Sequence, residues 1–342
     1  MSLKNAWYVA AWDTEITSEA LFARRILGLP VVFYRGEDGV AVALEDKCCH
    51  RLAPLSHGQR EGNCLRCMYH GLMFDATGRC VEVPGQERIG AHLKVRSFPL
   101  VERDRLLWIW MGDPARADPA AIHDAHWHDS ADWKAGRGGY IHYASAFQLI
   151  ADNLLDFSHL AFVHNKSIGT RKFAEVAPKI EMLDEAVRIT YFTPSAATAP
   201  FARALTKLPD VTDRIQLYTW HLRGCYFSQD SITALPGEGM ETSDPRAMRL
   251  HTMIALTPET ETTTHYFWSS AHNDFNPDIA DLTARLVVEV GRAFDEDRLI
   301  IEAQQRVIDE SPGSKMMAIR ADIALTDVRR MLDRLLAEEA AR

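Results

Sequence analysis

The chain has 342 residues, a length that allows about two domains. Hydrophobic residues make up 47% of it and charged residues 25%, which is the composition of an ordinary globular protein. The net charge is −9 and no basic cluster occurs, which argues against nucleic-acid binding, because that function needs lysine and arginine to neutralise phosphates. No apolar run approaches the roughly 18 residues of a membrane-spanning helix, so we expect no membrane insertion.

Short β-rich runs dominate the first third of the sequence. Residues 31–34 and 40–44 flank a Gly-Glu-Asp-Gly turn, a pattern that predicts a β-hairpin. The apolar run 106–111 is followed by a turn-rich stretch that begins at Gly112. We place a domain boundary in this stretch, with a first domain over residues 1–115 and a second over residues 116–342.

Two cysteines and two histidines form mixed pairs, Cys48 with His50 and Cys67 with His70. Two irons bridged by sulfide use such pairs, with both thiolates on one iron and both imidazoles on the other. A structural zinc site uses the same residue types at short spacings, so the spacing leaves zinc open. Cys49 lies beside Cys48, but the Cys-x-His order favours Cys48 as the ligand.

The cysteine usage predicts a reducing compartment. A chain of this length with no apolar leader segment does not indicate a disulfide framework. We therefore expect a cytoplasmic protein. The cysteines that we interpret as free thiols are Cys49, Cys64, Cys80 and Cys225.

A second group of potential metal ligands follows the first by about ninety residues. His159 and His164 are five residues apart, about 500° of turn on a regular helix, so they would point about 140° apart. Ligation of one ion by both therefore requires the helix to end, or to widen by a π-turn, between them. Asp156 and His159 are three residues apart and would share a helix face.

A candidate third ligand lies on a helix that we predict from Leu282 onward. Asp297 falls on its apolar stripe, whereas Asp295, Glu296 and Arg298 are expected to point elsewhere. A carboxylate on an apolar face is costly unless it is paired or binds a metal. Asp297 therefore either pairs with a buried arginine or a helix terminus, or completes a two-histidine, one-carboxylate iron site. Glu296 is the poorer alternative ligand.

The rest of the chain predicts further strands and a final helix. Residues 187–192 and 265–268 are β-like. The tail carries apolar residues at the spacing of an amphipathic helix, with Thr326 or Asp327 as its N-cap. We interpret this helix as a packing element.

These motifs resemble those of a known family. Residues 41–84 resemble the Rieske domain of aromatic-ring oxygenases, in particular the vanillate O-demethylase and toluenesulfonate methyl-monooxygenase group. Residues 153–164 resemble the family's mononuclear-iron segment, and residues 294–305 resemble its ligand helix. Cys49 and Met68 depart from the pattern, because prolines are common at both positions.

The resemblance covers nearly the whole chain and implies an α+β fold. An all-β Rieske domain would be followed by a catalytic domain of the helix-grip (START-like) type, an antiparallel sheet curled over a long helix. It also implies one 2Fe-2S cluster and one mononuclear Fe(II) per chain. The implied cluster ligands are Cys48, His50, Cys67 and His70, and the implied iron ligands are His159, His164 and Asp297.

The resemblance further implies a bridging role for Asp156. In the family, the cluster of one subunit lies near its neighbour's catalytic iron, and this carboxylate hydrogen-bonds to a cluster histidine and an iron histidine. Electron transfer from the cluster of one subunit to the iron of the next requires an oligomer. A homotrimer in which the subunits contact head to tail forms a closed ring of such pairs. Two alternatives stay open, since Asp156 could instead merely cap or pair within its helix. Asn153 either hydrogen-bonds near the iron or hydrogen-bonds to backbone groups left without partners where the helix breaks.

The implied function is that of a terminal oxygenase component. The chain has no nucleotide-binding glycine loop, so NADH would act through a separate reductase, expected to be of the flavin plus 2Fe-2S type. Dioxygen would be the co-substrate and a methyl group of a small aromatic acid the target. A ring methyl of a toluenesulfonate-like or toluate-like substrate would become an alcohol, and an O-methyl, as in vanillate, would leave as formaldehyde. Candidate donors to the acid are His251, His265 and His272.

Three other functions stay open. A ring cis-dihydroxylating dioxygenase would use the same metal centres. A Rieske electron carrier would need only the first 115 or so residues. A carrier of hydrophobic ligands with a helix-grip fold would need neither the cluster nor Asp297.

Overall fold

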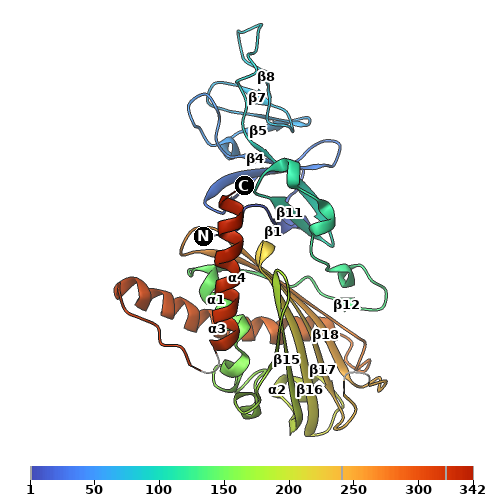
Figure 1. The fold of residues 1–342 in the computed structure, drawn as a ribbon. Coiled ribbons are helices and arrows are strands. Elements are labelled where there is room, and N and C mark those ends of the chain that lie inside the picture. The colour runs from blue at the N-terminus through green and yellow to red at the C-terminus, as the bar shows by residue number, and fades with distance from the viewer. Residues whose placement is uncertain (1, 240–241, 320–321, 342) are drawn as a thin grey trace. The chain divides into compact units, whose positions relative to one another are not determined.

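A computed structural model describes residues 2–239, 242–319 and 322–341. These residues form two compact units, which we describe separately (Figure 1). The N-terminal unit comprises Ser2–Ile122 with Thr257–Thr260, and the C-terminal unit comprises His123–Leu256 and the chain from Glu261 onward.

The N-terminal unit is built from small antiparallel sheets, as predicted. In the described residues their strand orders are β1-β11-β10, β2-β3-β4-β9 and β5-β6-β7-β8. The predicted hairpin is confirmed as β3 and β4, with Val31 opposite Glu45 and Arg35 opposite Ala41. The strands are β1 (Trp7–Trp12), β2 (Phe22–Ile26), β3 (Leu29–Arg35), β4 (Ala41–Glu45), β5 (Gln59–Glu61), β6 (Cys64–Arg66), β7 (Met73–Phe74), β8 (Cys80–Glu82), β9 (Ser97–Phe98), β10 (Leu100–Arg103) and β11 (Leu106–Trp110). The 3₁₀ helices are η1 (Asp13–Glu15), η2 (Leu55–His57), η3 (Pro114–Arg116) and η4 (Pro119–Ala121).

The C-terminal unit contains a large antiparallel sheet. Its order in the described residues is β12-β19-β18-β17-β16-β15-β14, and β13 also pairs with β19. The predicted runs 187–192 and 265–268 lie in β15 and β19 and are confirmed as strands. The strands are β12 (Lys134–Ala135), β13 (Gly139–Tyr143), β14 (Lys179–Met182), β15 (Ala186–Ala197), β16 (Val211–His221), β17 (Tyr226–Ala234), β18 (Met248–Pro258) and β19 (Thr264–His272).

A long helix packs on this sheet and makes the fold of the helix-grip type, as predicted. The ring of Phe294 on α3 lies 5.3 Å from the ring of Tyr266 and 5.1 Å from that of Trp268, both on β19. Helix α3 also contacts α1 and α2 (Figure 1). The helices are α1 (Phe147–Leu155), α2 (Pro200–Leu205), α3 (Leu282–Glu310) and α4 (Ile323–Ala340), and the 3₁₀ helices are η5 (His126–His128), η6 (Phe157–Ala161), η7 (Arg171–Ala174) and η8 (Arg223–Cys225).

The predicted start of the last helix is wrong. Helix α4 begins at Ile323, so Thr326 and Asp327 lie inside its first turns. The earlier start buries Leu325 and Val328 against the unit, and the Thr326 hydroxyl donates to the Asp322 carbonyl. Helix α4 contacts α1 and β15, which agrees with a packing role.

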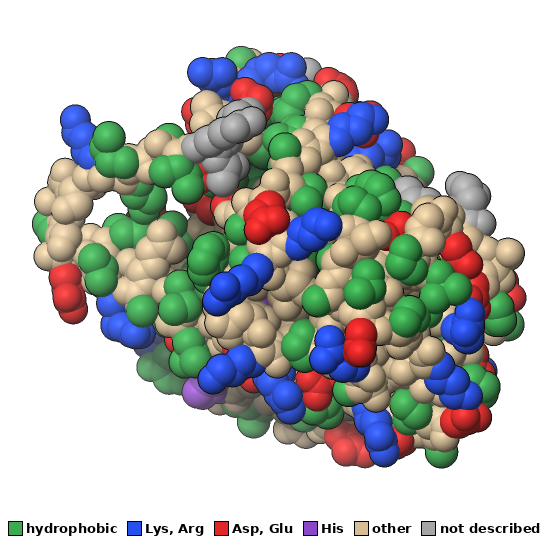
Figure 2. Space-filling view, turned by 90° about the horizontal axis from the view of Figure 1, so that it is seen from below, with side chains coloured by type: hydrophobic (Ala, Val, Ile, Leu, Met, Phe, Trp, Pro, Cys, Tyr) green, Lys and Arg blue, Asp and Glu red, His purple; other side chains and the backbone are tan. Residues whose placement is uncertain are grey.

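The surface has the mixed character of an ordinary globular protein. On the face in Figure 2, acidic and basic side chains are interspersed with apolar ones. Within the described ranges, no helix combines the length and the apolar composition that a bilayer crossing requires.

Two neighbouring histidines of the C-terminal unit have lowered pKa values. The rings of His123 and His221 are 4.6 Å apart, and Tyr226 stacks on His123 at 4.7 Å. Burial, with His123 adding to it, lowers the pKa of His221 to about 4. Burial also lowers the pKa of His123.

We expect the free energy of unfolding to fall as the pH drops from about 6.5 towards 4. In the unfolded chain these histidines have the ordinary pKa of about 6.5, so they bind protons in this pH window. In the folded chain their lowered pKa values keep them neutral, so acid favours the unfolded state. Urea titrations at several pH values measure this slope. The variant His221→Gln should show a shallower slope, and an unchanged slope would contradict the assignment.

Candidate metal centres and substrate cavity

The two loops with the mixed cysteine and histidine pairs share one backbone pattern. Cys48 N donates to Ala53 O and Cys67 N donates to Leu72 O, each at 2.8 Å. In both loops the residue four positions after the cysteine donates back to the cysteine carbonyl and has a positive φ, 61° at Leu52 and 78° at Gly71. Each loop therefore turns sharply between its cysteine and the strand that follows.

This loop geometry gathers the four predicted cluster ligands. Cys48 and Cys67 are 1% and 2% exposed and belong to one core cluster, while His50 and His70 are exposed with ring centroids 4.5 Å apart. Burial, with a contribution from Cys67, raises the pKa of Cys48 to about 11. Buried sulfurs beneath exposed imidazoles are the donor set of a Rieske centre, so the residues fit a 2Fe-2S cluster.

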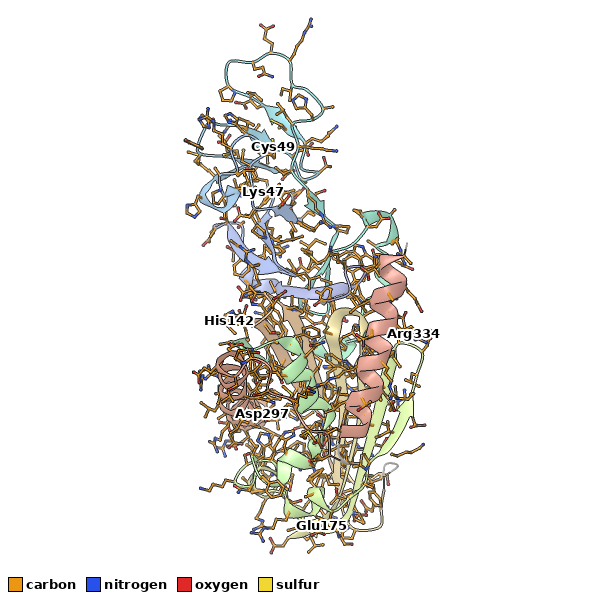
Figure 3. The ribbon with its side chains drawn as sticks, turned by 60° about the vertical axis from the view of Figure 1, so that its left-hand side comes forward. Lys47, Cys49, His142, Glu175, Asp297 and Arg334 are labelled. Carbon is orange, nitrogen blue, oxygen red and sulfur yellow. The ribbon has the colours of Figure 1, made fainter. Side chains whose placement is uncertain are left out.

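Cys49 takes a different position from its neighbour. Figure 3 labels Cys49 among the loops of the N-terminal unit. It packs, half-buried, against the core cluster that contains Cys48, and burial raises its pKa. His50, one residue further, is exposed beside His70. Cys48 is therefore the more deeply buried of the two adjacent thiols, and its pairing with His50 stays a prediction.

The segment that carries His159 and His164 differs from the predicted helix. Helix α1 ends at Leu155, and the chain continues as the 3₁₀ helix η6, so Asp156 and His159 do not share an α-helical face, which corrects the prediction. The 3₁₀ helix ends at Ala161, before His164, so the predicted break between the histidines is present as an end and not as a π-turn. Gly169 N donates to His164 O, and a Cβ at Gly169 would lie 1.8 Å from Leu160 O, so glycine permits the tight return of the chain.

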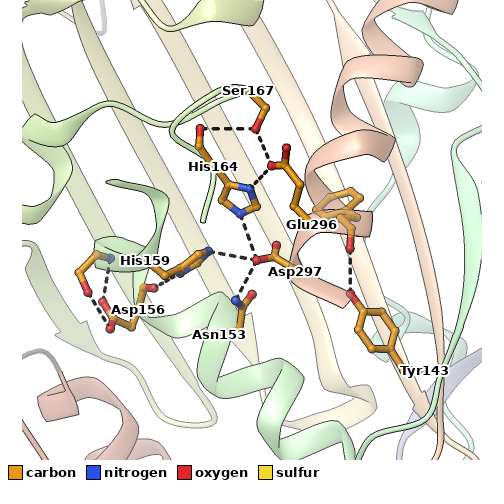
Figure 4. Close-up of polar contacts among 10 residues, drawn as sticks. Tyr143, Asn153, Asp156, His159, His164, Ser167, Glu296 and Asp297 are labelled. Carbon is orange, nitrogen blue, oxygen red and sulfur yellow. Dashed lines mark hydrogen bonds and ion pairs between the residues drawn. The ribbon is translucent and has the colours of Figure 1, made fainter. Parts of the chain in front are cut away.

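His159, His164 and Asp297 converge on one point (Figure 4). Asp297 Oδ1 lies 3.0 Å from His164 Nε2 and 3.5 Å from His159 Nε2, and the three potential ligand atoms are all within 4.8 Å of one another. Asp297 is buried on α3, as predicted from its stripe. Two imidazoles and one carboxylate fit a non-haem Fe(II) ion with adjacent open positions.

Both imidazoles are oriented through their other nitrogen. His159 Nδ1 lies 2.5 Å from the Asp156 carbonyl, and His164 Nδ1 lies 2.7 Å from Glu296 Oε2, which also accepts from the Ser167 hydroxyl at 2.6 Å. A proton on each Nδ1 leaves both Nε2 lone pairs directed at the metal position. The expectation that Glu296 points away from the site is therefore wrong. Because it is next to Asp297, it reaches the far side of the same ring.

The two histidines differ in electrostatic environment. Burial lowers the pKa of His159 despite the nearby Asp297. Burial acts in the same direction on His164, but Asp297 and Glu296 together outweigh it and raise its pKa. Two carboxylates around one imidazole therefore favour a cation at this site.

Asn153 and Asp156 make different contacts within the chain. Asn153 Nδ2 donates to Asp297 Oδ1 at 3.0 Å, which places Asn153 beside the metal position. The Asp156 carboxylate accepts from Ser158 N at 2.8 Å and from the Ser158 hydroxyl at 2.9 Å, so it caps η6 (Figure 4). The capping alternative is thus present in the single chain, and a bridge to a neighbour stays a prediction.

The three ligand candidates open onto a cavity that encloses about 670 Å3 of space between atoms, including space open to solvent. Its walls come from α1, η6, α3 and strands β16, β17 and β18, and most of its lining is apolar. The apolar lining residues are Leu154, Phe157, Leu160, Ile168, Phe201, Phe227, Leu250, Ile254, Val290, Ala293 and Phe294.

The predicted substrate-binding histidines are not among the described residues that line this cavity. Leu250 and Thr252 line it, so strand alternation turns His251 to the other face of β18, where it contacts Asp230 and Trp133. His265 hydrogen-bonds to Tyr140 at 2.8 Å, and His272 to Thr283 at 2.9 Å.

The polar residues of the cavity wall were not predicted from the sequence. Arg214 and Gln216 on β16 and Gln229 and Ser231 on β17 line the cavity beside Thr252. The available signal is the two-residue spacing of Arg214 and Gln216, which puts two polar groups on one face of β16. Periodicity alone does not say whether that face borders a core or a cavity.

Comparisons with known proteins agree with both sites. Residues 6–99 match the family model of the Rieske [2Fe-2S] domain, and residues 143–338 match that of the vanillate O-demethylase oxygenase C-terminal domain. The chain is 44% identical to the iron-sulfur subunit of a toluene-4-sulfonate monooxygenase system of Comamonas testosteroni, over 99% of this chain and 98% of that protein. It is 34% identical to a vanillate O-demethylase oxygenase subunit of Pseudomonas sp. (strain HR199 / DSM 7063), over 98% of this chain and 95% of that protein.

A solved structure agrees with these matches. The crystal structure of dicamba monooxygenase bound to 3,6-dichlorosalicylic acid superposes with a TM-score of 0.89 and 33% identity, covering 100% of both chains. The chain therefore belongs to the Rieske non-haem iron oxygenases, as an oxygenase component of the group that includes vanillate O-demethylase and toluenesulfonate monooxygenase.

Proposed function

We propose that this oxygenase component hydroxylates a methyl group of a small aromatic acid, using dioxygen and electrons from an NADH-dependent reductase. The observation that carries this proposal is the set of His159, His164 and Asp297 at the wall of a mostly apolar cavity. The higher identity to the toluene-4-sulfonate enzyme, 44% against 34% for the vanillate enzyme, favours a ring methyl over an O-methyl.

We assign the metal ligands as the sequence predicts. The cluster would be held by one mixed pair in each of the two matched loops, within a Rieske domain over residues 1–115. The iron would be held in the catalytic domain over residues 116–342. When bound, the cluster supplies single electrons and the iron activates dioxygen. The assigned ligands are Cys48, His50, Cys67 and His70 for the cluster and His159, His164 and Asp297 for the iron.

The chain's own residues then position the substrate and hold the ligand set. Phe157, Phe227 and Phe294 give the cavity aromatic walls that pack on a substrate ring. Asn153 holds Asp297 Oδ1, and Glu296 fixes the ring of His164, so the ligand geometry is set before substrate enters. The mostly apolar walls limit water near the reacting methyl group.

We also propose the assembly and partners that the family resemblance implies. A homotrimer would place the cluster of one subunit near the iron of the next, with Asp156 between them. A flavin and 2Fe-2S reductase would deliver the electrons. The exposed His50 and His70 support an approach from outside the chain, and the free cysteines favour a reducing compartment such as the cytoplasm.

Product analysis with labelled dioxygen tests the reaction. The purified protein, a flavin and 2Fe-2S reductase, and NADH are incubated with 4-methylbenzenesulfonate, 4-methylbenzoate and vanillate under ¹⁸O₂. A benzylic alcohol with one labelled oxygen supports ring-methyl hydroxylation, and formaldehyde from vanillate supports demethylation. A cis-diol with two labelled atoms would overturn the monooxygenase assignment.

The variant Asp156→Asn tests the bridging role. It should keep cluster and iron yet slow substrate-dependent oxidation of the reduced cluster by about 10- to 100-fold, the usual effect of removing an outer-shell partner. Stopped-flow absorption at the cluster band measures this rate. Ser158→Ala, which removes the side-chain partner of the cap and leaves the carboxylate, is the matched control. Normal oxidation in Asp156→Asn would leave Asp156 with its capping role alone.

A further inference from the structure

Arg214 is a buried cation on the wall of the cavity. It is 7% exposed, and its Nη1 donates to the Ile168 carbonyl at 2.6 Å. Its guanidinium carbon lies 5.0 Å from the ring centroid of Phe173 and 5.7 Å from that of Phe201. Its Nε has no hydrogen-bond partner among the described residues. One edge of the guanidinium is therefore held by the protein, while Nε is left without a partner.

The cation also has no anionic partner in the described part of the chain. The adjacent carboxylate of Asp213 faces the other way and accepts from Ser195 N at 2.7 Å and Gly237 N at 2.8 Å. Burial alone lowers the pKa of Arg214 to about 10, which leaves it charged at neutral pH. A buried charge is costly unless something pairs with it. The cavity beside Arg214 is where an anion can do so.

The neighbouring strands add neutral polar groups to the same wall. Gln216 on β16 lies directly opposite Ser231 on β17, two residues along the ladder from the pair of Arg214 and Thr233 and therefore on the same face. The Gln216 Oε1 and the hydroxyls of Ser231 and Thr233 are buried without a hydrogen-bond partner among the described residues. Several unsatisfied polar atoms therefore lie next to one unpaired cation, although buried polar groups are normally satisfied.

We propose that Arg214 binds the anionic group of the aromatic substrate, a sulfonate or a carboxylate, and so selects acids over neutral methyl arenes. Gln216 and Ser231 complete the anion site as hydrogen-bonding neighbours. A guanidinium suits both anions because its fork of N–H donors binds two oxygens at once. This inference rests on the proposed methyl hydroxylation and names the group that orients the substrate for it.

The position of Arg214 along β16 sets the orientation. Tyr218 on the same strand packs on Phe157, two residues before His159, with ring centroids 4.3 Å apart. Four residues of extended strand, about 13 Å, separate Arg214 from Tyr218. An acid held at Arg214 therefore directs the opposite end of its ring towards the His159 side of the cavity.

Binding measurements on variants test the inference without relying on turnover. Isothermal titration calorimetry of the anaerobic, iron-loaded protein compares 4-methylbenzenesulfonate and 4-methylbenzoate with the neutral 4-methylbenzenesulfonamide and 4-methylbenzamide. Arg214→Met should weaken both acids by roughly a hundredfold or more and change the amides by less than about threefold. Arg214→Lys keeps a charge without the fork and should show an intermediate loss. Arg188→Met, in β15 of the same sheet and outside the cavity lining, should bind both acids as the wild type does.

The outcomes separate this inference from the proposed function. Equal losses for acids and amides in Arg214→Met, or no loss for either, would overturn the anion site. If that variant does not fold, wild-type protein still decides, because it must bind 4-methylbenzenesulfonate much more tightly than 4-methylbenzenesulfonamide, and equal affinities would overturn the anion site. Binding that selects acids and depends on Arg214, with no hydroxylated methyl group formed from any compound, would support the anion site and refute the proposed hydroxylation. Hydroxylation of the methyl group of acids and amides at equal efficiency would support the proposed hydroxylation and refute the anion site.

Discussion

Replacing Asp297 by alanine is expected to remove the mononuclear iron and leave the cluster intact. Asp297 offers the carboxylate that lies within 3.5 Å of both histidine Nε2 atoms, and two imidazoles alone make a weak site for a hard divalent ion. Iron should fall by about one per chain while acid-labile sulfide stays constant. Product formation should fall by more than about a hundredfold, beyond the usual effect of losing a residue that merely supports a ligand.

Two neighbours on the same helix provide matched controls for Asp297→Ala. Glu296→Gln keeps an oxygen acceptor for His164 and removes the charge, so it should weaken iron binding by about 10- to 100-fold without abolishing it. Asp295→Asn alters an exposed residue that pairs with Arg298, and it should change nothing. Full iron content and activity in Asp297→Ala would refute the ligand assignment and turn attention to Glu296.

Replacing Cys67 by serine is expected to eliminate the cluster. Both proposed thiolate ligands are buried in the core of the N-terminal unit, where a serine hydroxyl is a poor iron ligand and an unsatisfied polar group. The rhombic paramagnetic resonance signal of the reduced protein should disappear, and sulfide should fall from about two per chain to none. Without electrons from the cluster, product formation should stop even where the mononuclear iron is retained.

Adjacent cysteines make this test specific. Cys48→Ser should behave like Cys67→Ser, whereas Cys49→Ser should keep the signal and the sulfide, because we assign the first thiolate ligand to Cys48. If Cys49→Ser lost the signal and Cys48→Ser kept it, the first cluster ligand would be Cys49 and not Cys48. Wild-type protein that contains zinc and no sulfide would refute the assignment of a 2Fe-2S cluster.

Much of the fold follows from local sequence patterns. The hairpin of β3 and β4, the strands β15 and β19 and the buried stripe of α3 all depend on periodicities of two or 3.6 residues, which the chain displays directly. The start of α4 was missed because Ile323, three residues before the predicted cap, already belongs to the helix, and no capping side chain marks that start. Periodicity locates the body of a helix, and its exact first residue is less well defined when no capping side chain marks it.

The sites were predictable where a motif carries the chemistry and not where tertiary contacts decide. The spacing of His159 and His164 required a break in the helix, but Asp156 marks an earlier change from α1 to η6 that the spacing does not reveal. Arg214 and Glu296 owe their roles to partners far away in sequence. A charged residue in a strand or on a helix does not disclose those partners in one sequence.

The contacts of His164 also have a dynamic consequence. Consecutive residues of α3, Glu296 and Asp297, contact opposite nitrogens of its ring. A half-turn of the imidazole about its Cβ–Cγ bond would put carbon atoms against both carboxylates and break both contacts. Ring flips of His164 should therefore be far slower than the picosecond-to-nanosecond rotamer changes of exposed side chains. Because both carboxylates come from α3, a shift of that helix would change both contacts of the ring at once.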